Sequence, residues 1–282
     1  RFDRYNEIST QIRSIFFDYT DMVEPLSLDE AFLDVTNNKF DHPSATMLAQ
    51  KIRLRIFNEV GLHASAGISI NKFVAKIASD INKPNGQKTI PPEDVLKFLE
   101  NLAINKFFGV GKVTAEKMKF HGIFLGKDLK KFSKEYLIQH FGKSGSHFYN
   151  IVRGNDFSEV KPNRIRKSIA AERTFGKDLR SHDFMFEQLS KIAEELERRM
   201  IKSNLKGKTI SIKLKYSDFT VQTRSKTLSE FVNKKSEFID VVKGLLNQEE
   251  ISKSVRLLGI SITKLNTLET KKSMSVQLIL DF

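Results

Sequence analysis

The residues with the clearest chemical potential are an adjacent acidic pair, Asp29 and Glu30, within residues 27–36. Apolar residues surround the pair, which predicts a short strand at the margin of a hydrophobic core, with Leu26 and Leu28 among its buried residues. Because unpaired carboxylates are costly to bury, such a pair normally has a cation or hydrogen-bond donors beside it. Carboxylate oxygens suit Mg²⁺, and the phosphates of a substrate can complete its coordination shell. The pair therefore predicts a divalent-metal site or, alternatively, a strand end with two solvated acids.

Three lysines, Lys72, Lys76 and Lys83, could complement this acidic pair. The first two fall in a helix expected over residues 72–81, which Asn71 would cap, and the third follows that helix in the sequence Lys-Pro-Asn-Gly. Lysines that converge on the edge of a sheet with paired acids could neutralise a triphosphate while the acids hold its metal ion. Taken singly, each lysine would equally fit a solvated surface.

The elements that would position these side chains alternate between helices and strands. Apolar periodicity predicts one helix through about Thr20 and a second over residues 45–60, which Gly61 would end at the C-cap. A strand rich in small residues is expected over residues 63–70. This alternation predicts an α/β sheet layer over residues 1–91 of an α+β multidomain protein.

Residues 92–160 predict a compact helical domain. Within it, residues 107–118 have the form of a helix-hairpin-helix, in which glycines let the backbone turn tightly. Backbone amides and a helix N-terminus can then face a DNA phosphate, a contact that positions the protein without reading bases. An ordinary connection between two helices is the alternative. The DNA contacts predicted here are Gly109, Val110, Gly111 and Lys112.

The last part of the chain begins with a basic linker, residues 161–168, and continues as strand, helix, strand, strand, helix and strand to residue 265, with the second helix over residues 230–246. This βαββαβ pattern predicts a small sheet with both helices on one face. Alternation in residues 210–216 predicts lysines on the open face and aliphatic residues towards the helices. A basic sheet face suits a DNA backbone, and its binding should weaken with salt. The residues predicted to contact DNA here are Arg173, Lys213, Lys215, Arg224, Ser225, Lys226 and Thr227.

The charge distribution favours a polyanionic partner. The net charge is +13 over 282 residues, and residues 161–282 hold 25 Lys and Arg against 15 Asp and Glu, a net charge of +10. Residues 1–91 are balanced, with 11 of each sign. The absence of cysteine excludes disulfides, zinc–thiolate sites and cysteine nucleophiles, and no apolar run is long enough to span a membrane. We expect a catalytic part with no net charge joined to a basic domain that binds a polyanion. A solvated basic surface without such a partner is the alternative.

Three segments closely resemble the palm motifs of Y-family translesion DNA polymerases, in particular their bacterial DNA polymerase IV branch. They are residues 27–34 (SLDEAFLD), residues 65–80 (SAGISINKFVAKIASD) and residues 83–86 (KPNG). The resemblance runs through the whole chain and implies five parts. These are a partial palm (1–91), a thumb with the helix-hairpin-helix (92–160), a basic linker (161–168), a DNA-binding little finger (169–270) and a tail (271–282).

The resemblance also implies the roles of the site residues. Asp29 and Glu30 would be two of the three carboxylates that hold two Mg²⁺ ions for nucleotidyl transfer, one ion activating the primer 3′-hydroxyl and the other binding the triphosphate. Lys83 matches the lysine that contacts the triphosphate, and Lys76 would lie near the phosphates. The implied partners are primer–template DNA and deoxynucleoside triphosphates. A monomer in the bacterial cytoplasm, associated with the nucleoid, is expected.

The end of the chain is similar to the peptide that bacterial replication proteins insert into the sliding clamp. It has a glutamine, spaced leucines and a terminal aromatic residue, and a short extended peptide with apolar anchors is a plausible ligand for a groove. A frayed final strand is the alternative. The residues predicted to bind the clamp are Gln277, Leu278, Leu280 and Phe282.

The sequence departs from the family at its beginning. The third metal carboxylate, the steric-gate aromatic residue and the fingers domain of the family precede the part that Arg1 matches, so we expect an N-terminal segment before Arg1. A molecule that starts at Arg1 is expected to give no primer extension with Mg²⁺ and nucleotides. Two other functions therefore stay open: a non-catalytic module that binds DNA and tethers it to the clamp, and a palm-like nucleotidyl enzyme such as a cyclase. The cyclase would have no use for a helix-hairpin-helix or a basic sheet.

Overall fold

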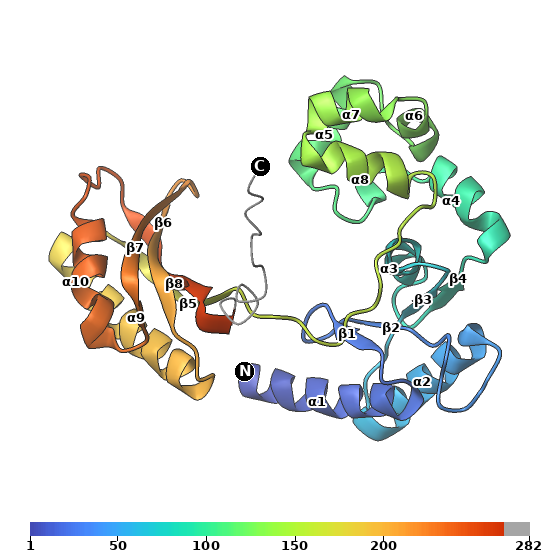
Figure 1. Cartoon of the computed structure of the whole chain (residues 1–282), viewed down its shortest axis with the longest axis horizontal. Coiled ribbons are helices and arrows are strands. Elements are labelled where there is room, and N and C mark those ends of the chain that lie inside the picture. Colours follow the sequence, from blue (N-terminus) through green and yellow to red (C-terminus); the bar gives the residue numbers. More distant parts are fainter. Residues whose placement is uncertain (268–282) are drawn as a thin grey trace, which may run out of the picture. The chain divides into compact units, whose positions relative to one another are not determined.

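The computed structural model describes residues 1–267, and Figure 1 shows their path. The chain forms two compact units, Arg1–Asn163 and Arg164–Phe282, the second of which is described as far as Thr267. Both units combine helices with strands, so the predicted α+β multidomain class is confirmed. Within residues 1–267, no helix is long and apolar enough to cross a membrane.

The first part of unit 1 packs helices around two small sheets. Helices α1 and α2 share a core that includes Ile15, Leu48 and Ile52, and Gly61 ends α2 in the left-handed conformation at φ 75°, as predicted. Strand β1 pairs with β2 antiparallel, and β3 pairs with β4 parallel. The bounds are α1 (Phe2–Tyr19), β1 (Val23–Pro25), β2 (Ala31–Leu33), α2 (Ala45–Val60), β3 (Ala66–Ile68), α3 (Lys72–Ile81) and β4 (Gln87–Thr89).

The acidic pair does not lie within a strand. Strands β1 and β2 form a hairpin, and the chain between them turns back through hydrogen bonds from Leu26 N and Ser27 N to Glu30 O, of 2.9 and 3.2 Å. In this turn the side chains of Leu26 and Leu28 are 36% and 37% exposed. The prediction that they bury the segment is therefore wrong, because the turn projects beyond the two strands and nothing packs over it closely enough to cover them.

The rest of unit 1 is a cluster of short helices whose core continues into α3. Phe73, Val74 and Ile77 of α3 lie in the same buried cluster as Leu99, Met118 and other residues up to Val152. The predicted division at residue 91 thus falls within one compact unit, and the palm and thumb remain predicted domains. The bounds are η1 (Pro92–Asp94), α4 (Val95–Asn101), η2 (Ile104–Lys106), α5 (Lys112–Phe120), α6 (Gly126–Lys130), α7 (Lys134–Phe141) and α8 (Lys143–Ile151).

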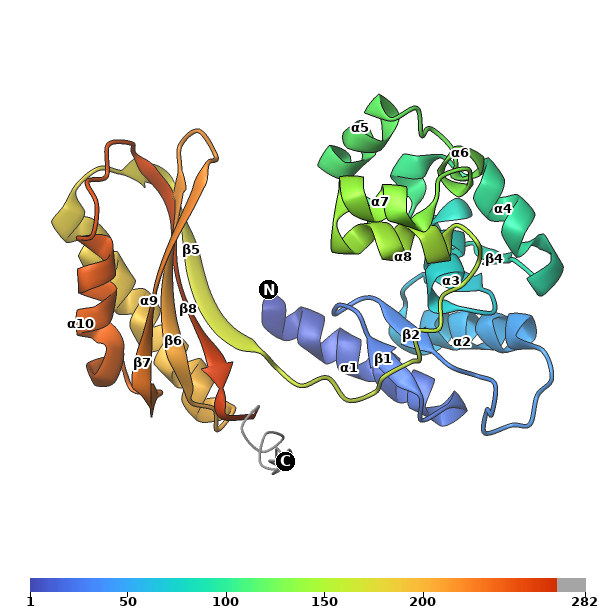
Figure 2. The same ribbon diagram turned by 45° about the horizontal axis from the view of Figure 1, so that its top comes forward.

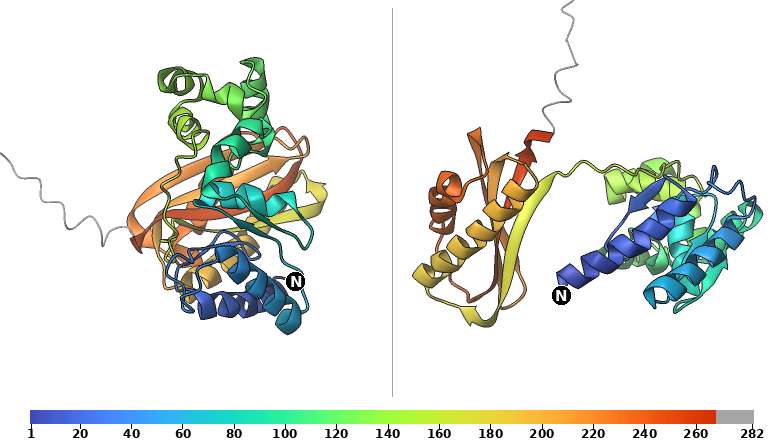
Figure 3. Two further views of the ribbon diagram at one scale, coloured as in Figure 1. Left: turned by 90° about the vertical axis from the view of Figure 1, so that its right-hand side faces the viewer. Right: turned by 90° about the horizontal axis from the view of Figure 1, so that it is seen from below.

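Unit 2 is a four-stranded antiparallel sheet of order β5-β8-β6-β7, with α9 and α10 on one face (Figures 2 and 3). The predicted βαββαβ order is confirmed. The predicted start of the second helix at residue 230 is wrong, because β7 continues to Val232 in register with Gly207. The bounds are β5 (Ser168–Leu179), α9 (His182–Lys202), β6 (Gly207–Tyr216), β7 (Val221–Val232), α10 (Lys235–Leu246) and β8 (Val255–Leu265).

Candidate active site

The predicted acids and lysines meet in one network of ion pairs. Lys76 Nζ lies 3.2 Å from Glu30 Oε1 and 3.5 Å from Asp80 Oδ2. Lys83 Nζ lies 2.5 Å from Asp80 Oδ1. No role was predicted for Asp80 from the sequence, although it lies four residues after Lys76 and three before Lys83, the spacings at which helical side chains meet. The hairpin, the second half of α3 and the loop after this helix are thereby joined through Glu30, Lys76, Asp80 and Lys83.

The electrostatic environment favours the charged forms of Asp80 and Lys83. Burial alone would raise the pKa of the Asp80 carboxyl, but the hydrogen bond from Lys83 and the charge of Lys76 outweigh it and lower that pKa. The hydrogen bond to Asp80 raises the pKa of the Lys83 ammonium against the opposing effect of burial, and the charges of Glu30 and Asp29 add to this rise. Lys83 is therefore a fixed positive charge within the field of both predicted metal carboxylates.

Asp29 occupies the exposed tip of the hairpin. Ser27 Oγ donates a hydrogen bond of 2.5 Å to Asp29 Oδ1, and the same hydroxyl accepts one of 3.3 Å from Asp29 N. These two hydrogen bonds orient the Asp29 carboxylate within the turn. The two adjacent, water-accessible carboxylates are the hard oxygen ligands that divalent metal ions prefer.

The donor set fits a divalent metal ion only in part. Among residues 1–267, no group of three or more His, Cys, Asp or Glu side chains is arranged to hold a metal ion. Asp29 and Glu30 would thus supply some of the ligands, and a bound substrate would have to supply others. Substrate phosphates are suitable, because Mg²⁺ commonly takes one or two carboxylates together with phosphate oxygens and water.

A second lysine of α3 fixes the base of the same hairpin. Lys72 Nζ lies 2.6 Å from Glu24 Oε2 on β1 and 5.1 Å from the ring centre of Phe32 on β2. Glu24 also accepts a hydrogen bond of 2.8 Å from Lys161 N. Burial would raise the pKa of Glu24, but the hydrogen bonds from Lys72 and Lys161 lower it overall. Since Lys72 and Lys76 are one helical turn apart, α3 holds the hairpin both at its base and near its acids.

The predicted helix-hairpin-helix has the expected turn. Gly109 adopts φ +88°, a conformation that favours glycine, and Gly111 precedes the first residue of α5, Lys112, which is exposed. Val110 is 9% exposed and its amide already donates to Phe107 O. The DNA contacts of Gly109, Val110, Gly111 and Lys112 stay a prediction.

The uncovered face of the unit 2 sheet is rich in hydroxyl groups. Strand register places Lys213 and Lys215 on this face, opposite the buried Ile212 and Leu214, as predicted. Lys213 Nζ lies 3.0 Å from Glu172 Oε2. The cross-strand hydroxyl pairs are Thr209–Thr227 at 2.9 Å and Ser211–Ser225 at 2.7 Å.

Three predicted DNA contacts do not lie on that open face. Arg173 pairs in register with Leu258, and Lys226 with Ile210, so both belong to the side of the sheet that the helices cover. They remain exposed because β5 and β7 are edge strands. Arg224 lies on the same side and is only 6% exposed. The placement of all three on the open face is thus wrong.

Arg224 instead binds the end of α10. Its Nη1 donates to Leu245 O and Leu246 O, at 2.9 and 2.8 Å, and these carbonyls have no partner within the helix. Its Nη2 donates to Gln222 Oε1 at 3.1 Å. The guanidinium is therefore a structural C-terminal cap.

Replacing Arg224 with methionine is expected to destabilise unit 2 by about 2 kcal/mol, because two buried carbonyls lose a charged donor. Urea unfolding followed by circular dichroism measures this change. The matched control is Lys226→Met, an exposed site on the same strand, which should shift the stability by less than about 0.5 kcal/mol. Equal effects of the two substitutions would contradict the capping role.

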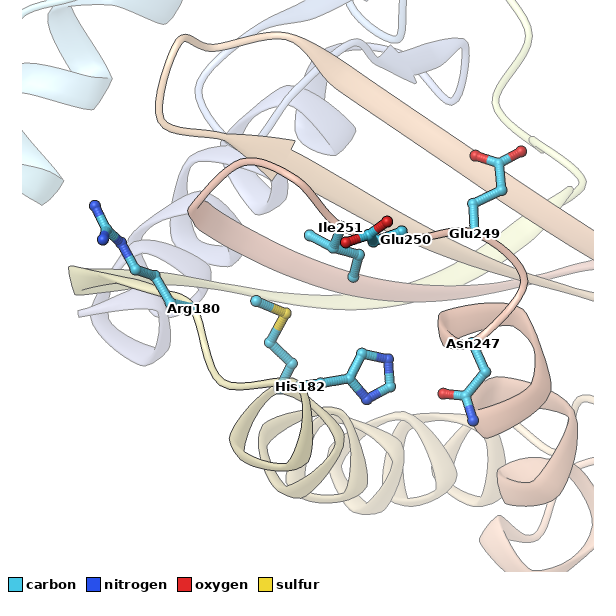
Figure 4. Close-up of a pocket in the computed structure, with 7 residues that line it drawn as sticks. Arg180, His182, Asn247, Glu249, Glu250 and Ile251 are labelled. Atoms are coloured by element: carbon cyan, nitrogen blue, oxygen red, sulfur yellow. The ribbon is translucent and has the colours of Figure 1, made fainter.

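A cavity of about 360 Å³ lies in unit 2 between the turn from β5 to α9 and the loop after α10 (Figure 4). Its lining combines Arg180 and His182 with Glu249 and Glu250, so it lacks the charge of one sign that a phosphate site would need. None of the predicted site residues lines it.

The predicted clamp-binding residues Gln277, Leu278, Leu280 and Phe282 lie outside the described residues.

Comparison with known proteins defines the class. The chain matches the impB/mucB/samB family over residues 1–80, the IMS family HHH motif over residues 92–123 and the impB/mucB/samB family C-terminal domain over residues 166–278. A Y-family DNA polymerase chimera of Dbh and Dpo4 superposes with a TM-score of 0.84 at 25% identity, covering 94% of this chain and 77% of that chain. The fold is that of the Y-family DNA polymerases.

Relatives with higher identity narrow the class. "DNA polymerase IV 2" of Agrobacterium fabrum is 50% identical over 266 residues, which cover 94% of this chain and 74% of that protein. "DNA polymerase IV" of Listeria monocytogenes serotype 4b is 47% identical over 262 residues, or 93% of this chain and 74% of that protein. The chain belongs to the DNA polymerase IV family, as the palm motifs predicted. It spans about three quarters of the length of these relatives.

Proposed function

We propose that the chain acts in template-directed DNA synthesis of the translesion type, adding nucleotides to a primer 3′ end with Mg²⁺ at Asp29 and Glu30. The observation that carries this proposal is the connected network of Glu30, Lys76, Asp80 and Lys83. It gathers the groups needed for a metal-bound triphosphate beside one hairpin. Y-family polymerases use divalent metal ions, which when bound activate the primer hydroxyl and neutralise the leaving pyrophosphate.

The residues of the network have different tasks in this proposal. Lys83 is 48% exposed, so its ammonium can exchange Asp80 for a phosphate oxygen. Lys76 is only 14% exposed and holds Glu30 in place, while its position near the phosphates lowers the cost of their charge. Asp80 keeps both lysines oriented before the nucleotide arrives. Positioning and electrostatic stabilisation of this kind carry most of the catalysis in phosphoryl transfer.

Primer–template DNA and deoxynucleoside triphosphates are the partners that the proposal requires. Lys112 at the start of α5 and Lys213 and Lys215 on the open sheet face supply positive charge for phosphates. Neutralising several phosphates releases condensed counterions, so DNA binding should fall steeply as salt rises. No base-specific contact is needed for a polymerase that copies any template. The proposal places the protein in the cytoplasm at the nucleoid.

A second candidate function is a DNA-binding module that tethers the sliding clamp without catalysis. The observation that favours it is the incomplete carboxylate set in the part of the chain that the structure describes. Primer extension by this chain on a primed template with Mg²⁺ and all four nucleotides decides between the two functions. No extension, with DNA binding retained, would favour the tethering function. Extension to full length would contradict the tethering function and support the polymerase.

We propose that the tail binds the sliding clamp through Gln277, Leu278, Leu280 and Phe282. Apolar anchors of a short peptide contribute most of the affinity for a groove. Replacing Leu280 and Phe282 together with alanine is therefore expected to abolish clamp binding in a pull-down with purified bacterial clamp. DNA affinity should stay at the parental value. Unchanged clamp affinity would contradict the assignment.

A further inference from the structure

The loop that carries Lys83 is held tightly from two directions. Residues 83–86 connect α3 to β4, and Gly86 accepts a hydrogen bond of 3.0 Å from Ala66 N and donates one of 3.3 Å to Ser65 Oγ. A Cβ added at Gly86 would lie 1.7 Å from Asn82 O, so this residue has no room for a side chain. The loop is thus hydrogen-bonded to Ser65 and Ala66 on one side and packs directly against Asn82 at the end of α3 on the other.

Arg53 of α2 fastens the same loop from a third direction. Its Nη2 donates to Asn85 O at 2.7 Å and to Asn85 Oδ1 at 2.9 Å. Its Nε donates to Ala64 O at 2.8 Å, and its Nη1 reaches Gln87 Oε1 at 3.5 Å. One side chain therefore ties together α2, the segment before β3 and both ends of the turn that follows Lys83.

The geometry of Arg53 suits this task better than that of any other cation. A guanidinium presents several N–H donors in one rigid plane, whereas a lysine ammonium is a single point on a flexible stem. The loop also needs a brace, because Asn85 adopts φ +50°, in the left-handed region that costs energy for a residue with a side chain. Arg53 binds both the backbone oxygen and the side-chain oxygen of Asn85, so it stabilises this conformation directly.

Helix α2 provides a firm base for Arg53. Two helical turns earlier, Thr46 O accepts a hydrogen bond of 2.8 Å from Gln87 Nε2, and Thr46 Oγ1 lies 2.9 Å from Thr89 Oγ1. Residues seven apart lie on one helix face, so Thr46 and Arg53 together align α2 with β4. The opposite face of α2 is buried against α1 through Leu48 and Ile52. Movement of Arg53 would therefore require movement of the whole helix.

We propose that Arg53 is a positioning residue for nucleotide binding: through Asn85 it sets the place from which the Lys83 ammonium meets the triphosphate. This inference rests on the proposed function of Lys83. Arg53 contacts Asn85, and Lys83 lies two residues before Asn85 in the same loop. Loss of the Arg53 contacts should therefore weaken the nucleotide contact without removing the charge of Lys83. A structural role alone would lower stability and leave nucleotide affinity unchanged.

The experiment measures the equilibrium Kd of the incoming nucleotide on a dideoxy-terminated primer–template with Mg²⁺, so that no turnover is needed. Arg53→Lys keeps the positive charge but loses the planar set of guanidinium donors, and its nucleotide Kd is expected to rise about tenfold. The extension rate at saturating nucleotide should change by less than about threefold. Asn85→Gly, which permits the left-handed backbone conformation but removes the side chain and with it the Oδ1 contact, should raise the Kd about threefold.

Arg55→Lys is the matched control. Arg55 is two residues further along α2 but pairs with Asp18 at 3.0 Å and Glu59 at 2.7 Å, away from the loop. The nucleotide Kd of the Arg55→Lys variant should equal the parental value. A Tm for Arg53→Lys close to that of Arg55→Lys shows that the loop and not the fold is changed. If Arg53→Lys does not fold, the Asn85→Gly variant carries the test.

A Lys83→Met variant separates failure of this inference from failure of the proposed function. If Lys83→Met leaves the Kd unchanged, the triphosphate role of Lys83 is wrong, and the inference is overturned with it. If Lys83→Met weakens nucleotide binding while Arg53→Lys and Asn85→Gly do not, the inference alone is overturned. Support requires that Arg53→Lys adds little to the Kd in the Lys83→Met background, because the two residues act along one path.

Discussion

Replacing Glu30 with glutamine is expected to lower the rate of primer extension on the order of 10³-fold, because an isosteric neutral group removes charge where the reacting phosphates gather. Glu30 is the carboxylate that the network orients, through its contact of 3.2 Å with Lys76. Mg²⁺-dependent nucleotide binding should weaken as well. Single-turnover extension of a labelled primer by the protein, at saturating nucleotide, measures the effect.

Glu59→Gln is the control for this prediction. Glu59 is an exposed acid on α2 that pairs with Arg55, so its loss changes the net charge equally without touching the hairpin. DNA affinity of both variants should stay within about twofold of the parent, since neither residue lies on the proposed DNA-binding surfaces. Parental extension by Glu30→Gln would remove Glu30 from the catalytic site. The same large loss in Glu59→Gln would attribute the effect to charge in general.

Alanine at Gly67 is expected to destabilise unit 1 by about 3 kcal/mol and to weaken nucleotide binding at the same time. A Cβ at this position would lie 2.0 Å from Ala75 O and 2.3 Å from Ser79 N, both backbone atoms of α3 that cannot turn aside. Helix α3 would have to move away from β3, and it carries Lys76 and ends at the Lys83 loop. Urea unfolding by circular dichroism and nucleotide titration measure the two effects.

Gly244→Ala is the matched control for Gly67→Ala. Gly244 lies in α10 with no atom within 4 Å of an added Cβ. Alanine there should be neutral or should stabilise unit 2 by up to about 1 kcal/mol, because it favours a helix more than glycine does. If alanine at Gly67 causes no loss of stability, α3 can shift away from β3. The position of Lys76 would then not depend on the close approach of α3 to Gly67.

Patterns of local periodicity predicted most of the elements. The apolar face of α2 predicted the extent of the helix, and the glycine after it predicted where the helix ends, because both signals are local and agree. The alternation in β6 likewise predicted which residues face the helices, because that strand is central and one of its faces is fully buried. The motifs around Glu30, Lys76 and Lys83 predicted that these residues belong to one site.

The errors share a physical cause, which is that tertiary contacts decide the burial of polar and turn residues. Arg224 lies in an edge strand without apolar alternation, and it is buried only because the end of α10 arrives beside it. Arg53 lies on an amphipathic helix, but its partners are 11 to 34 residues away, so no local pattern could have identified them. Leu26 lies in a turn, and the burial of its side chain depends on tertiary neighbours that no local sequence pattern specifies.

The paired hydroxyls of the open sheet face have a consequence for how a moving duplex would be held. In the pairs Thr209–Thr227 and Ser211–Ser225, either oxygen can be the donor, and the direction reverses by rotation of two hydrogens alone. Such a surface offers a donor or an acceptor at each point without rearranging a heavy atom. For the DNA proposed to lie there, either hydroxyl of a pair could then donate to a phosphate oxygen, so a contact could pass from one hydroxyl to the other by rotation of hydrogens alone.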